Sequence, residues 1–354
     1  MNKKKNILIA GPILPPAGGI SIHLQRLQQL LDDEFDFTFI DEASIIKKSV
    51  FNIRSLNLIR YLKLIIDADL FFIHSGNKYF KKLHIICGKL LRKKIIITLH
   101  GYGNERDYFL KNIDSFFFNL ADKIVLVNNE ISYKLLLKNS KCIVKHAFLP
   151  PAMNMEAALP ESISKKISNA RSTNSTIICA NASKLITFDN QDLYGLDMCI
   201  ELSKSLAANH FPHLFVFVVT SLSEGMERYE NAINQILKEK MEDHFMLMNK
   251  EISFVKLIEQ ADIVIRPTHT DGDALTIREG LFLQKTVLAS DVVIRPEGTI
   301  LFKNRDQSDL FAKVTSVIQH KSLNNENQKK SLTTGIQEEK IFYSNLFKSV
   351  MSNN

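Results

Sequence analysis

The sequence predicts an α/β protein of two domains, each a parallel β-sheet covered by helices on both faces. Short apolar runs alternate with amphipathic segments through residues 1–148, and the alternation restarts at residue 175 and continues to residue 334. Repeated strand–helix units of this kind form parallel sheets. The chain of 354 residues is also longer than one ordinary domain. Two doubly wound domains are therefore expected.

The first domain is expected to contain strands that are buried on both faces, because its strand runs are continuously apolar, as at residues 95–97. The expected strands are residues 7–10, 35–40, 69–74, 94–99, 123–128 and 142–145. The expected helices lie near residues 21–31, 54–66, 78–91, 106–120 and 130–137.

Residues 149–174 interrupt this rhythm with Pro150, Pro151 and Pro160, and they are predicted to form a linker. The strands expected after it are residues 176–181, 213–220, 245–249, 262–266 and 286–289. The helices expected there are residues 193–206, 225–240, 252–259, 274–284 and 307–319. A loop rich in Asn, Gln and Lys is predicted at residues 321–333, followed by an amphipathic helix at about residues 337–351.

Charge is distributed unevenly along the chain. Residues 1–150 hold 23 Lys/Arg and 13 Asp/Glu, a net charge of +10, whereas the remainder carries −3. A basic half beside a mildly acidic one indicates an anionic partner for the first half. Nucleic acid is the less favoured partner, because no recognised binding module is present. The other candidate is an anionic membrane leaflet.

The segment at residues 78–94 is basic on one side and apolar on the other, and Arg54, Arg60 and Lys63 add charge in the same half. It fits either a core helix with a solvated cationic face or a helix whose cationic face lies on an anionic leaflet.

The cysteines and the N-terminus indicate a cytosolic protein, either free or peripheral on the inner face of the membrane. The four cysteines show no metal-ligand spacing and lie in apolar segments, which predicts buried free thiols in a reducing compartment. The apolar run at residues 6–10 is too short for a signal peptide, and no run is long enough to span a bilayer. The cysteines are Cys87, Cys142, Cys179 and Cys199.

The most informative stretch is residues 266–280, a polar loop between a buried strand and a helix. In a parallel sheet such a loop lies at the carboxyl end of a strand, where ligands bind, and the free N–H groups of the following helix suit a phosphate. The stretch also carries the loop acids Asp271 and Asp273 and the helix acid Glu279, which lies eight positions after Asp271. Because carboxylates repel a phosphate, hydroxyl groups of a sugar and a ribose are their natural partners. The stretch therefore predicts a nucleotide-sugar site.

Three further motifs each fit a ligand role or an ordinary structural one. Gly18 and Gly19 precede the first helix, where they fit a ligand-binding loop or a tight turn. His100 follows a strand and is flanked by glycines, so it fits sugar binding, proton transfer or a structural turn, and His74 has the same ambiguity. Lys184, after the first strand of the second half, fits a diphosphate contact or a solvated surface side chain.

Other chemistries lack support in the sequence. No Gly-x-Ser-x-Gly elbow occurs, and no pair of histidines has metal-ligand spacing. Serine hydrolysis and a metal site are therefore not expected.

Taken together, these motifs resemble the retaining glycosyltransferases of the GT-B fold, in the large family four group. Asp271-Gly272 and Glu279-Gly280 match the spacing of that family's two Glu residues, and Lys285-Thr286-Val287 stands at its following strand. The loop at residues 15–20 is similar to the family's glycine loop, and His100 lies in what resembles its acceptor-side loop.

The strings at residues 194–197 and 290–298 resemble a subgroup found in bacterial surface-polysaccharide clusters. The chain departs from the family pattern in two places. The first acid is Asp rather than Glu, and of the family's Arg and Lys after the second domain's first strand only Lys184 has a counterpart, while Tyr194 stands near the other position.

The resemblance implies two Rossmann-like domains facing a cleft, with residues 335–354 as a helix that packs back on the first domain. The first domain would bind a lipid-linked or oligosaccharide acceptor, and the second a UDP- or GDP-linked sugar, without a metal or other cofactor. Asp271, Glu279 and His100 would be catalytic, and Gly18 and Gly19 would let the backbone approach a ligand. The implied donor-binding residues are Lys184, Arg266, Gly272, Asp273, Ala274, Leu275 and Glu279.

The implied function is transfer of a hexose or related sugar to a growing bacterial surface glycan of the lipopolysaccharide O-antigen or capsule type. Two alternatives remain open. One is a non-catalytic subunit of the same fold that binds a nucleotide-sugar or a partner enzyme. The other is a sugar-nucleotide epimerase of that fold, which would need no acceptor.

Overall fold

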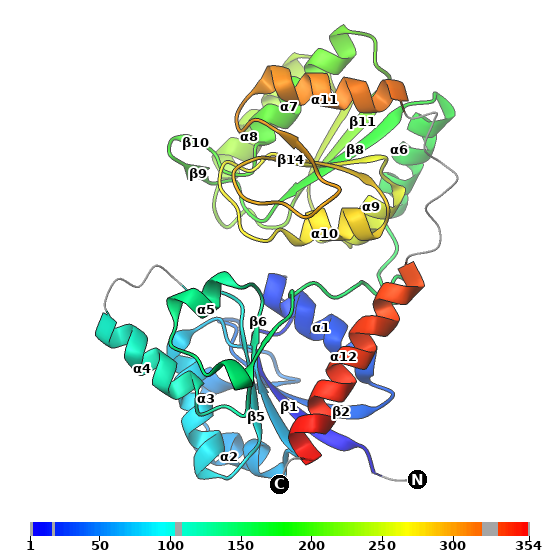
Figure 1. Cartoon of the computed structure of the whole chain (residues 1–354). Coiled ribbons are helices and arrows are strands. Elements are labelled where there is room, and N and C mark those ends of the chain that lie inside the picture. The colour runs from blue at the N-terminus through cyan, green and yellow to red at the C-terminus, as the bar shows by residue number, and fades with distance from the viewer. Residues whose placement is uncertain (1–2, 16–17, 103–107, 321–331, 353–354) are drawn as a thin grey trace. The chain divides into compact units, whose positions relative to one another are not determined.

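The computed structural model describes residues 3–15, 18–102, 108–320 and 332–352. The chain forms two compact units (Figure 1). Unit 1 comprises Met1–Pro150 together with Thr333–Asn354, and unit 2 comprises Pro151–Leu332. The last part of the chain therefore belongs to the same unit as the first part.

Unit 1 is built around a parallel sheet of seven strands within the described residues, in the order β3-β2-β1-β4-β5-β6-β7. The central strand β1 pairs in parallel with β2 and β4, so that Ile9 lies opposite both Phe39 and Phe72. The strands are β1 Lys5–Gly11, β2 Phe35–Asp41, β3 Phe51–Asn52, β4 Leu70–Ile73, β5 Ile95–Leu99, β6 Lys123–Leu126 and β7 Cys142–Val144.

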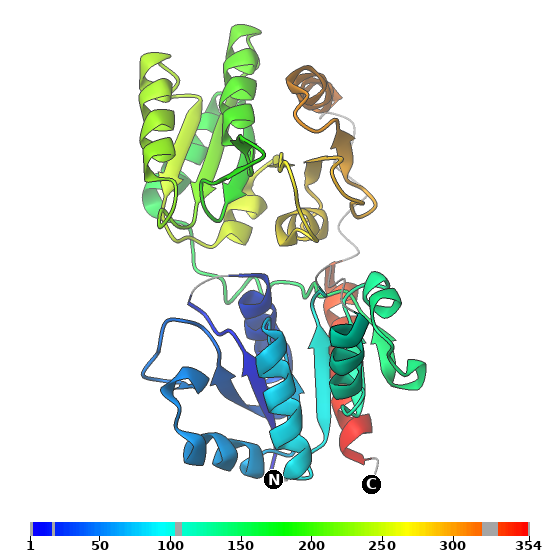
Figure 2. The ribbon, with the colours of Figure 1, turned by 90° about the vertical axis from the view of Figure 1, so that its left-hand side faces the viewer.

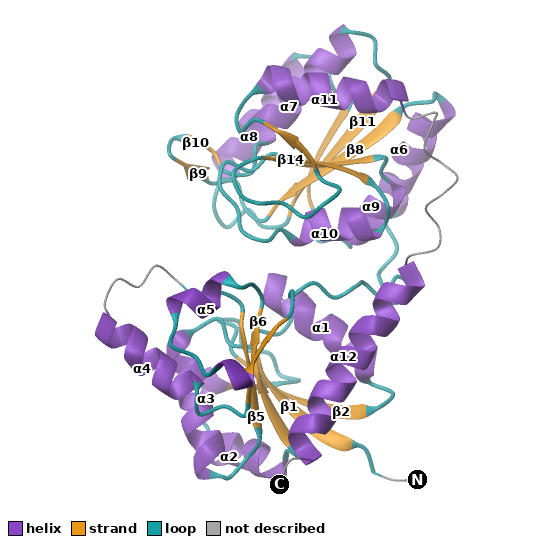
Figure 3. Ribbon diagram, viewed as in Figure 1, coloured by secondary structure: helices purple, strands orange, loops and turns teal. Residues whose placement is uncertain are grey.

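Helices cover both faces of this sheet (Figures 1 and 3). Side chains of β1 alternate between the faces, as the pleat requires: Ile7 and Ile9 pack with α1 and α12, whereas Leu8 and Ala10 pack with the other helices. The helices of the first face are α1 Gly19–Leu31 and α12 Leu332–Ser352. Those of the second face are α2 Leu58–Asp67, α3 Lys78–Leu90, α4 Tyr108–Phe118 and α5 Glu130–Lys134.

Helix α12 is bound to unit 1 by both apolar and charged contacts. Phe347 packs edge-on against Phe35 and Phe72, with ring centroids 5.5 and 5.2 Å apart. Lys348 Nζ lies 2.6 Å from Glu34 of the α1–β2 connection. These contacts seal one face of the unit 1 sheet.

Unit 2 has a parallel sheet with the order β12-β11-β8-β13-β14-β15 and, apart from it, a short antiparallel hairpin. Its helices again cover both faces, with α7, α8 and α11 on one and α6, α9 and α10 on the other. The strands are β8 Thr176–Ala182, β11 His213–Val219, β12 Phe245–Asn249, β13 Ile263–Arg266, β14 Thr286–Ser290 and β15 Ile300–Phe302, with the hairpin β9 Thr187–Phe188 and β10 Gln191–Asp192. The helices are α6 Glu161–Ser172, α7 Leu196–Ala208, α8 Met226–Lys238, α9 Phe254–Gln260, α10 Leu275–Phe282 and α11 Gln307–His320.

The structure differs from the sequence-based expectation in a few places. The predicted linker contains α6, whose Ile163 and Ile167 are buried against the unit 2 sheet. Cys87 and Cys142 are only partly buried, although all four cysteines are free, as predicted. Most of the predicted loop at residues 321–333 lies outside the described residues, and its last two residues belong to α12.

Among the described residues, none of the helices combines the length and the apolar composition that a membrane span requires. The same residues contain no group of three or more His, Cys, Asp or Glu side chains arranged to hold a metal ion.

Candidate functional site

The candidate site in unit 2 is the loop between β13 and α10. Strand β13 is an inner strand that pairs in parallel with β8 and β14, so the loop leaves the sheet at the carboxyl end, where ligands bind in such sheets. Helix α10 begins at Leu275 after an extended Ala274, and no described side chain caps its first amides. Those amides form the kind of site that accepts a phosphate.

Asp271 is the centre of a charged network rather than a free carboxylate. Arg266 donates to both of its oxygens, from Nε to Oδ2 at 3.1 Å and from Nη2 to Oδ1 at 3.2 Å. Arg295 Nη1 donates to Oδ2 at 2.9 Å, and the Thr268 hydroxyl donates to the same oxygen at 3.0 Å. With two guanidinium groups around it, the carboxylate is held in one orientation within the loop.

Arg295 joins this network from the segment after β14, and the sequence analysis did not single it out. Its side chain is only 2% exposed, and its Nε donates to the backbone carbonyl of Ser290 at 3.0 Å. The Ser290 hydroxyl in turn donates to the carbonyl of Thr268 at 2.6 Å. Because β13 and β14 are adjacent, the loops that follow them meet, and Arg295 locks one to the other.

The environment of Asp271 keeps it ionised. Burial by itself raises the pKa of this carboxyl group, but the guanidinium groups of Arg266 and Arg295 lower it by more. The net pKa lies below its usual value, so Asp271 carries its negative charge throughout the physiological range.

Glu279, the second predicted acid, lies within α10 and is buried. Helix α10 packs closely on the sheet, because a Cβ on its Gly280 would come within 2.6 Å of Val287 in β14. The Thr276 hydroxyl donates to Asn181 Oδ1 of β8 at 3.0 Å and fixes the first turn of the helix. A buried carboxylate on a helix held in this way is a rigid hydrogen-bond acceptor.

Two other cations, the predicted donor-binding Lys184 and Arg278 of α10, are already paired with acids. Lys184 forms an ion pair with Glu224, and Arg278 Nε donates to Asp273 Oδ1 at 2.6 Å. Both carboxylates are substantially exposed, and such surface pairs contribute little to stability. A diphosphate can therefore compete for either cation, and a Cβ on Gly272 of the loop would meet no described atom within 4 Å.

Arg266 is also held from the side of the β9–β10 hairpin. Its guanidinium lies over the Tyr194 ring, 5.1 Å from the centroid. Tyr194 is positioned by Asp192, whose carboxylate accepts hydrogen bonds from the amides of Tyr194 and Gly195. Gly195 has φ +68, and a Cβ there would lie 2.4 Å from the carbonyl oxygen of Pro267, so only glycine fits this close approach.

In unit 1 the structure brings three histidines together at the carboxyl edge of the sheet. His74 follows β4, His100 follows β5, and His23 lies in α1. His74 Nδ1 and His100 Nε2 are 3.0 Å apart, and the Thr98 hydroxyl lies 3.3 Å from His74 Nε2. The His23 ring is centred 5.1 Å from His74 and 5.7 Å from His100. His100 is therefore supported by His74, for which the sequence left the same roles open.

Burial keeps these rings neutral. It lowers the pKa of His23 to about 4, and it lowers the pKa values of His74 and His100 well below the usual value, with neighbouring positive charge adding to the effect. His23 Nδ1 donates to the carbonyl of Ala147 at 2.6 Å, so its Nε2 carries a lone pair, and that atom has no partner among the described residues.

The three histidines predict that the folded protein becomes less stable as the pH falls below about 6.5. Because their pKa values are lower in the folded chain than in the unfolded one, the unfolded chain takes up protons below about pH 6.5 that the folded chain does not, and this proton uptake favours unfolding as the pH falls. Each histidine lowers the free energy of unfolding by at most about 1.4 kcal/mol for each unit by which the pH falls. We expect urea unfolding of His23→Gln to show a shallower loss of stability between pH 6.5 and 5 than the native chain. An unchanged slope would contradict the neutral state assigned to His23.

The predicted glycine loop at residues 15–20 is described only in part, because residues 16 and 17 lie outside the described residues. Gly103, which follows His100 in the other predicted loop, also lies outside them. Gly18 precedes α1 with an extended backbone, and its amide donates to the Ser21 hydroxyl at 2.9 Å. A Cβ on Gly19 would meet no atom within 4 Å, so no described residue fills the space beside it.

Comparison with known proteins identifies the fold. No protein-family model matches the sequence, and no curated protein sequence does either. Among solved structures, the chain is similar to HepE of Anabaena in complex with UDP and glucose, with a TM-score of 0.66, 12% identity, and coverage of 98% of this chain and 99% of HepE. A glycosyltransferase from Rickettsia africae matches with a TM-score of 0.64, 16% identity and full coverage of both chains.

Sucrose-phosphate synthase of Thermosynechococcus elongatus is a further match, with a TM-score of 0.61, 12% identity, and coverage of 99% of this chain and all of the synthase chain. The chain has the GT-B fold. The predicted fold class is thereby confirmed, since GT-B proteins contain two parallel α/β sheets like those of units 1 and 2.

Proposed function

We propose that this protein is a glycosyltransferase that moves a sugar from a nucleotide-sugar donor, and that unit 2 holds the donor. The supporting observation is that α10 combines an uncapped amino end with the buried Glu279, at the carboxyl end of an inner parallel strand. The helix amides would bind the diphosphate, and Glu279 would accept hydrogen bonds from the ribose hydroxyls.

The proposed donor is a UDP-sugar. HepE has been crystallised with UDP and with UDP-glucose, and it shares this fold over nearly the full length of both chains. Arg278 lies in α10 itself, and Lys184 follows β8, the strand whose Asn181 accepts a hydrogen bond from Thr276 of α10; each cation is paired with an exposed acid. In the proposed complex these cations and the α10 amides stabilise the leaving diphosphate as electrostatic preorganisation requires, without a metal ion.

The proposed role of Asp271 changes once its contacts are considered. A carboxylate engaged by two arginines and a threonine has little capacity left for a sugar hydroxyl. We assign it to holding Arg266 and the loop in place, so that Gly272, Asp273, Ala274 and Leu275 present their backbone to the donor.

Unit 1 would bind the acceptor. His100 is neutral and positioned by His74, so it can orient a sugar by hydrogen bonding without adding charge. The open space at Gly19 suits close approach of a ligand. We propose a lipid-linked or growing surface glycan as acceptor, at the inner face of the cytoplasmic membrane, with retention of configuration as in the family four enzymes that the motifs resemble.

The donor assignment is tested by thermal unfolding of the full chain with a panel of UDP- and GDP-sugars and with UDP alone. A ligand at 100 times its dissociation constant stabilises the folded protein by about 2.7 kcal/mol. We expect UDP and at least one UDP-sugar to raise the unfolding temperature, and GDP to have a smaller effect. No shift with any nucleotide would exclude unit 2 as a donor site.

A non-catalytic subunit that binds a nucleotide-sugar is the second candidate, and the engagement of Asp271 by arginines is the observation that favours it. The two candidates differ in turnover. A transferase should slowly hydrolyse the UDP-sugar that stabilises it, whereas a binding subunit should release no UDP over the same period.

A further inference from the structure

The outer layer of unit 1 carries an unusual concentration of exposed apolar side chains. Of the 23 large apolar side chains that lie exposed in the described part of the chain, ten belong to residues 45–90. Most of these ten lie on α2, on α3 or in the turn before α2. Single exposed apolar residues are normal on a protein surface, whereas a contiguous group indicates an interaction site.

Helix α2 carries two apolar stripes. Its buried stripe, Tyr61 and Ile65, faces the sheet. A second stripe has helical spacing at Ile59, Leu62 and Ile66, with Ile59 84% exposed and Ile66 also exposed. A helix that only covers a core needs the first stripe and not the second.

Helix α3 repeats this arrangement. His84, Ile85 and Gly88 are buried on its inner side. Leu83 and Leu90 are exposed with Ile86 between them, at the same spacing as the outer stripe of α2, and Leu90 is 77% exposed. Both helices thus carry a second apolar stripe that faces solvent.

The two outer stripes lie on neighbouring helices. Helices α2 and α3 cover the same face of the sheet and lie next to one another (Figures 1 and 2). The Tyr61 hydroxyl is 2.8 Å from His84 Nδ1, and Lys93 Nζ donates to the carbonyl of Ile66 at 2.6 Å. One contact joins the middle of the helices, and the other ties the segment after α3 to the end of α2.

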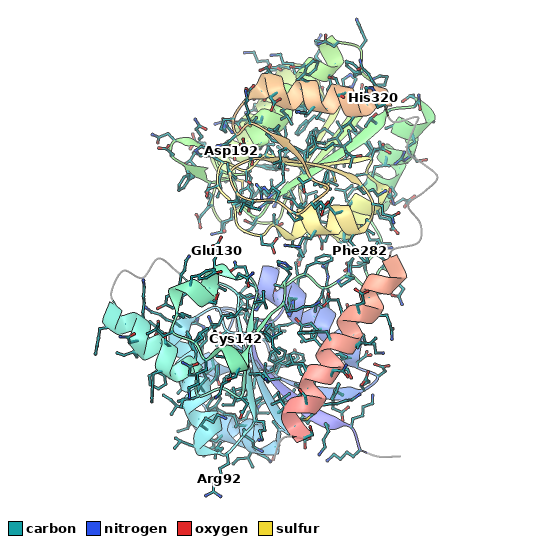
Figure 4. All side chains as sticks on the ribbon, in the orientation of Figure 1. Arg92, Glu130, Cys142, Asp192, Phe282 and His320 are labelled. Carbon is teal, nitrogen blue, oxygen red and sulfur yellow. The ribbon has the colours of Figure 1, made fainter. Side chains whose placement is uncertain are left out.

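This surface is also strongly cationic. Residues 43–104 contain 12 Lys/Arg and only two acids, Asp67 and Asp69. Asp69 is paired with Lys5 at 3.0 Å. Arg60 and Lys63 stand on the exposed side of α2. On α3, Lys82 and Lys89 are paired with Asp114 and Asp122, whereas Arg92, just after the helix, points away from the fold (Figure 4).

We propose that the outer stripes of α2 and α3 form a docking surface for an anionic lipid bilayer. Apolar side chains flanked by cations fit the boundary between acyl chains and acidic headgroups, because the apolar groups enter the membrane while the cations remain at its surface. A protein partner would need a complementary acidic and apolar patch, whereas an anionic leaflet supplies both properties everywhere. The proposal rests on the lipid-linked acceptor proposed above. Docking on the bilayer would bring the protein to the membrane in which that acceptor is anchored.

The test is cosedimentation of the full chain with vesicles of phosphatidylcholine containing about 30% phosphatidylglycerol, compared with phosphatidylcholine alone. We expect binding to the anionic vesicles that weakens with salt, since the cations contribute about fivefold each to the partition coefficient. The double variant Ile59→Gln/Leu90→Gln should bind at least about tenfold more weakly. Both residues are mostly exposed, so the variant should fold normally.

The matched control is Leu237→Gln, which removes a 52% exposed leucine from α8 of unit 2 and should leave vesicle binding unchanged. Equal loss in the control and the double variant would overturn the proposal. It would also be overturned if the native chain formed a dimer that the double variant does not form, because the stripes would then join two copies.

Vesicle binding does not depend on donor chemistry, so the two proposals can fail separately. Glu279→Gln should bind anionic vesicles as the native chain does. If no UDP-sugar binds but the vesicle result holds, only the transferase proposal fails. If UDP-sugars bind but the double variant still binds vesicles normally, only the docking surface fails.

Discussion

Replacing Glu279 by glutamine is expected to weaken UDP binding, and any transfer from a UDP-sugar, by about 10- to 100-fold. A hydrogen bond to a charged group contributes ~1.5–3 kcal/mol, which corresponds to that range. Glu279 is the only carboxylate of α10, and it is buried in a helix whose first turn is fixed by the Thr276–Asn181 hydrogen bond. The amide of glutamine keeps the volume but loses the charge.

The measurement is calorimetric titration of UDP into the native chain, Glu279→Gln and a control, Glu201→Gln. Glu201 is an exposed residue of α7, so its replacement should leave UDP affinity unchanged. Unfolding temperatures of the three proteins show whether loss of binding reflects loss of fold. If Glu279→Gln binds UDP as tightly as the native chain, the ribose contact does not involve this residue.

The second large effect is expected on stability. Asp271→Ala should destabilise unit 2 by about 3–5 kcal/mol, because it leaves the buried guanidinium of Arg295 without its carboxylate. Asp273→Ala is the matched control from the same loop. Its carboxylate is 44% exposed and paired with Arg278, and such surface pairs contribute only about 0–1 kcal/mol.

Urea unfolding of the native chain, the two single variants and Asp271→Ala/Arg295→Met provides the comparison. The double variant should recover part of the loss, since it no longer buries the unpaired charge of Arg295. The stabilisation by Asp271 should also disappear below about pH 4, since its folded pKa lies below the unfolded value of about 3.9. A loss below 1 kcal/mol for Asp271→Ala would show that the network does not hold the loop.

Much of the fold could be predicted because the strand signal is strong. Buried parallel strands are short continuous apolar runs, and the longer ones, such as β1, β8 and β11, lie where the runs predict them. The two-residue strands β3, β9 and β10 were missed, because two residues cannot establish a pattern. Helix α6 was missed because it is mostly polar and buries little more than Ile163 and Ile167.

The site could be predicted only where it is local in sequence. The loop with Asp271 follows its strand directly, so strand, loop and helix could be read in order. Arg295 is 24 residues away from Asp271 and reaches it only because β13 and β14 are neighbours in the sheet. His74 reaches His100 in the same way, through the pairing of β4 and β5. Partners that depend on strand order cannot be found from spacing alone.

The position of α12 has a consequence for how the chain is made. One face of the unit 1 sheet, with Ile9 and Phe72, is closed by Tyr343 and Phe347, which are synthesised after all of unit 2. Nascent chains fold as they leave the ribosome, domain by domain. Unit 2 can therefore reach its native state during translation, whereas unit 1 must wait with an open apolar face until the final helix emerges. Unit 1 is thus completed after unit 2, although most of unit 1 is translated before it.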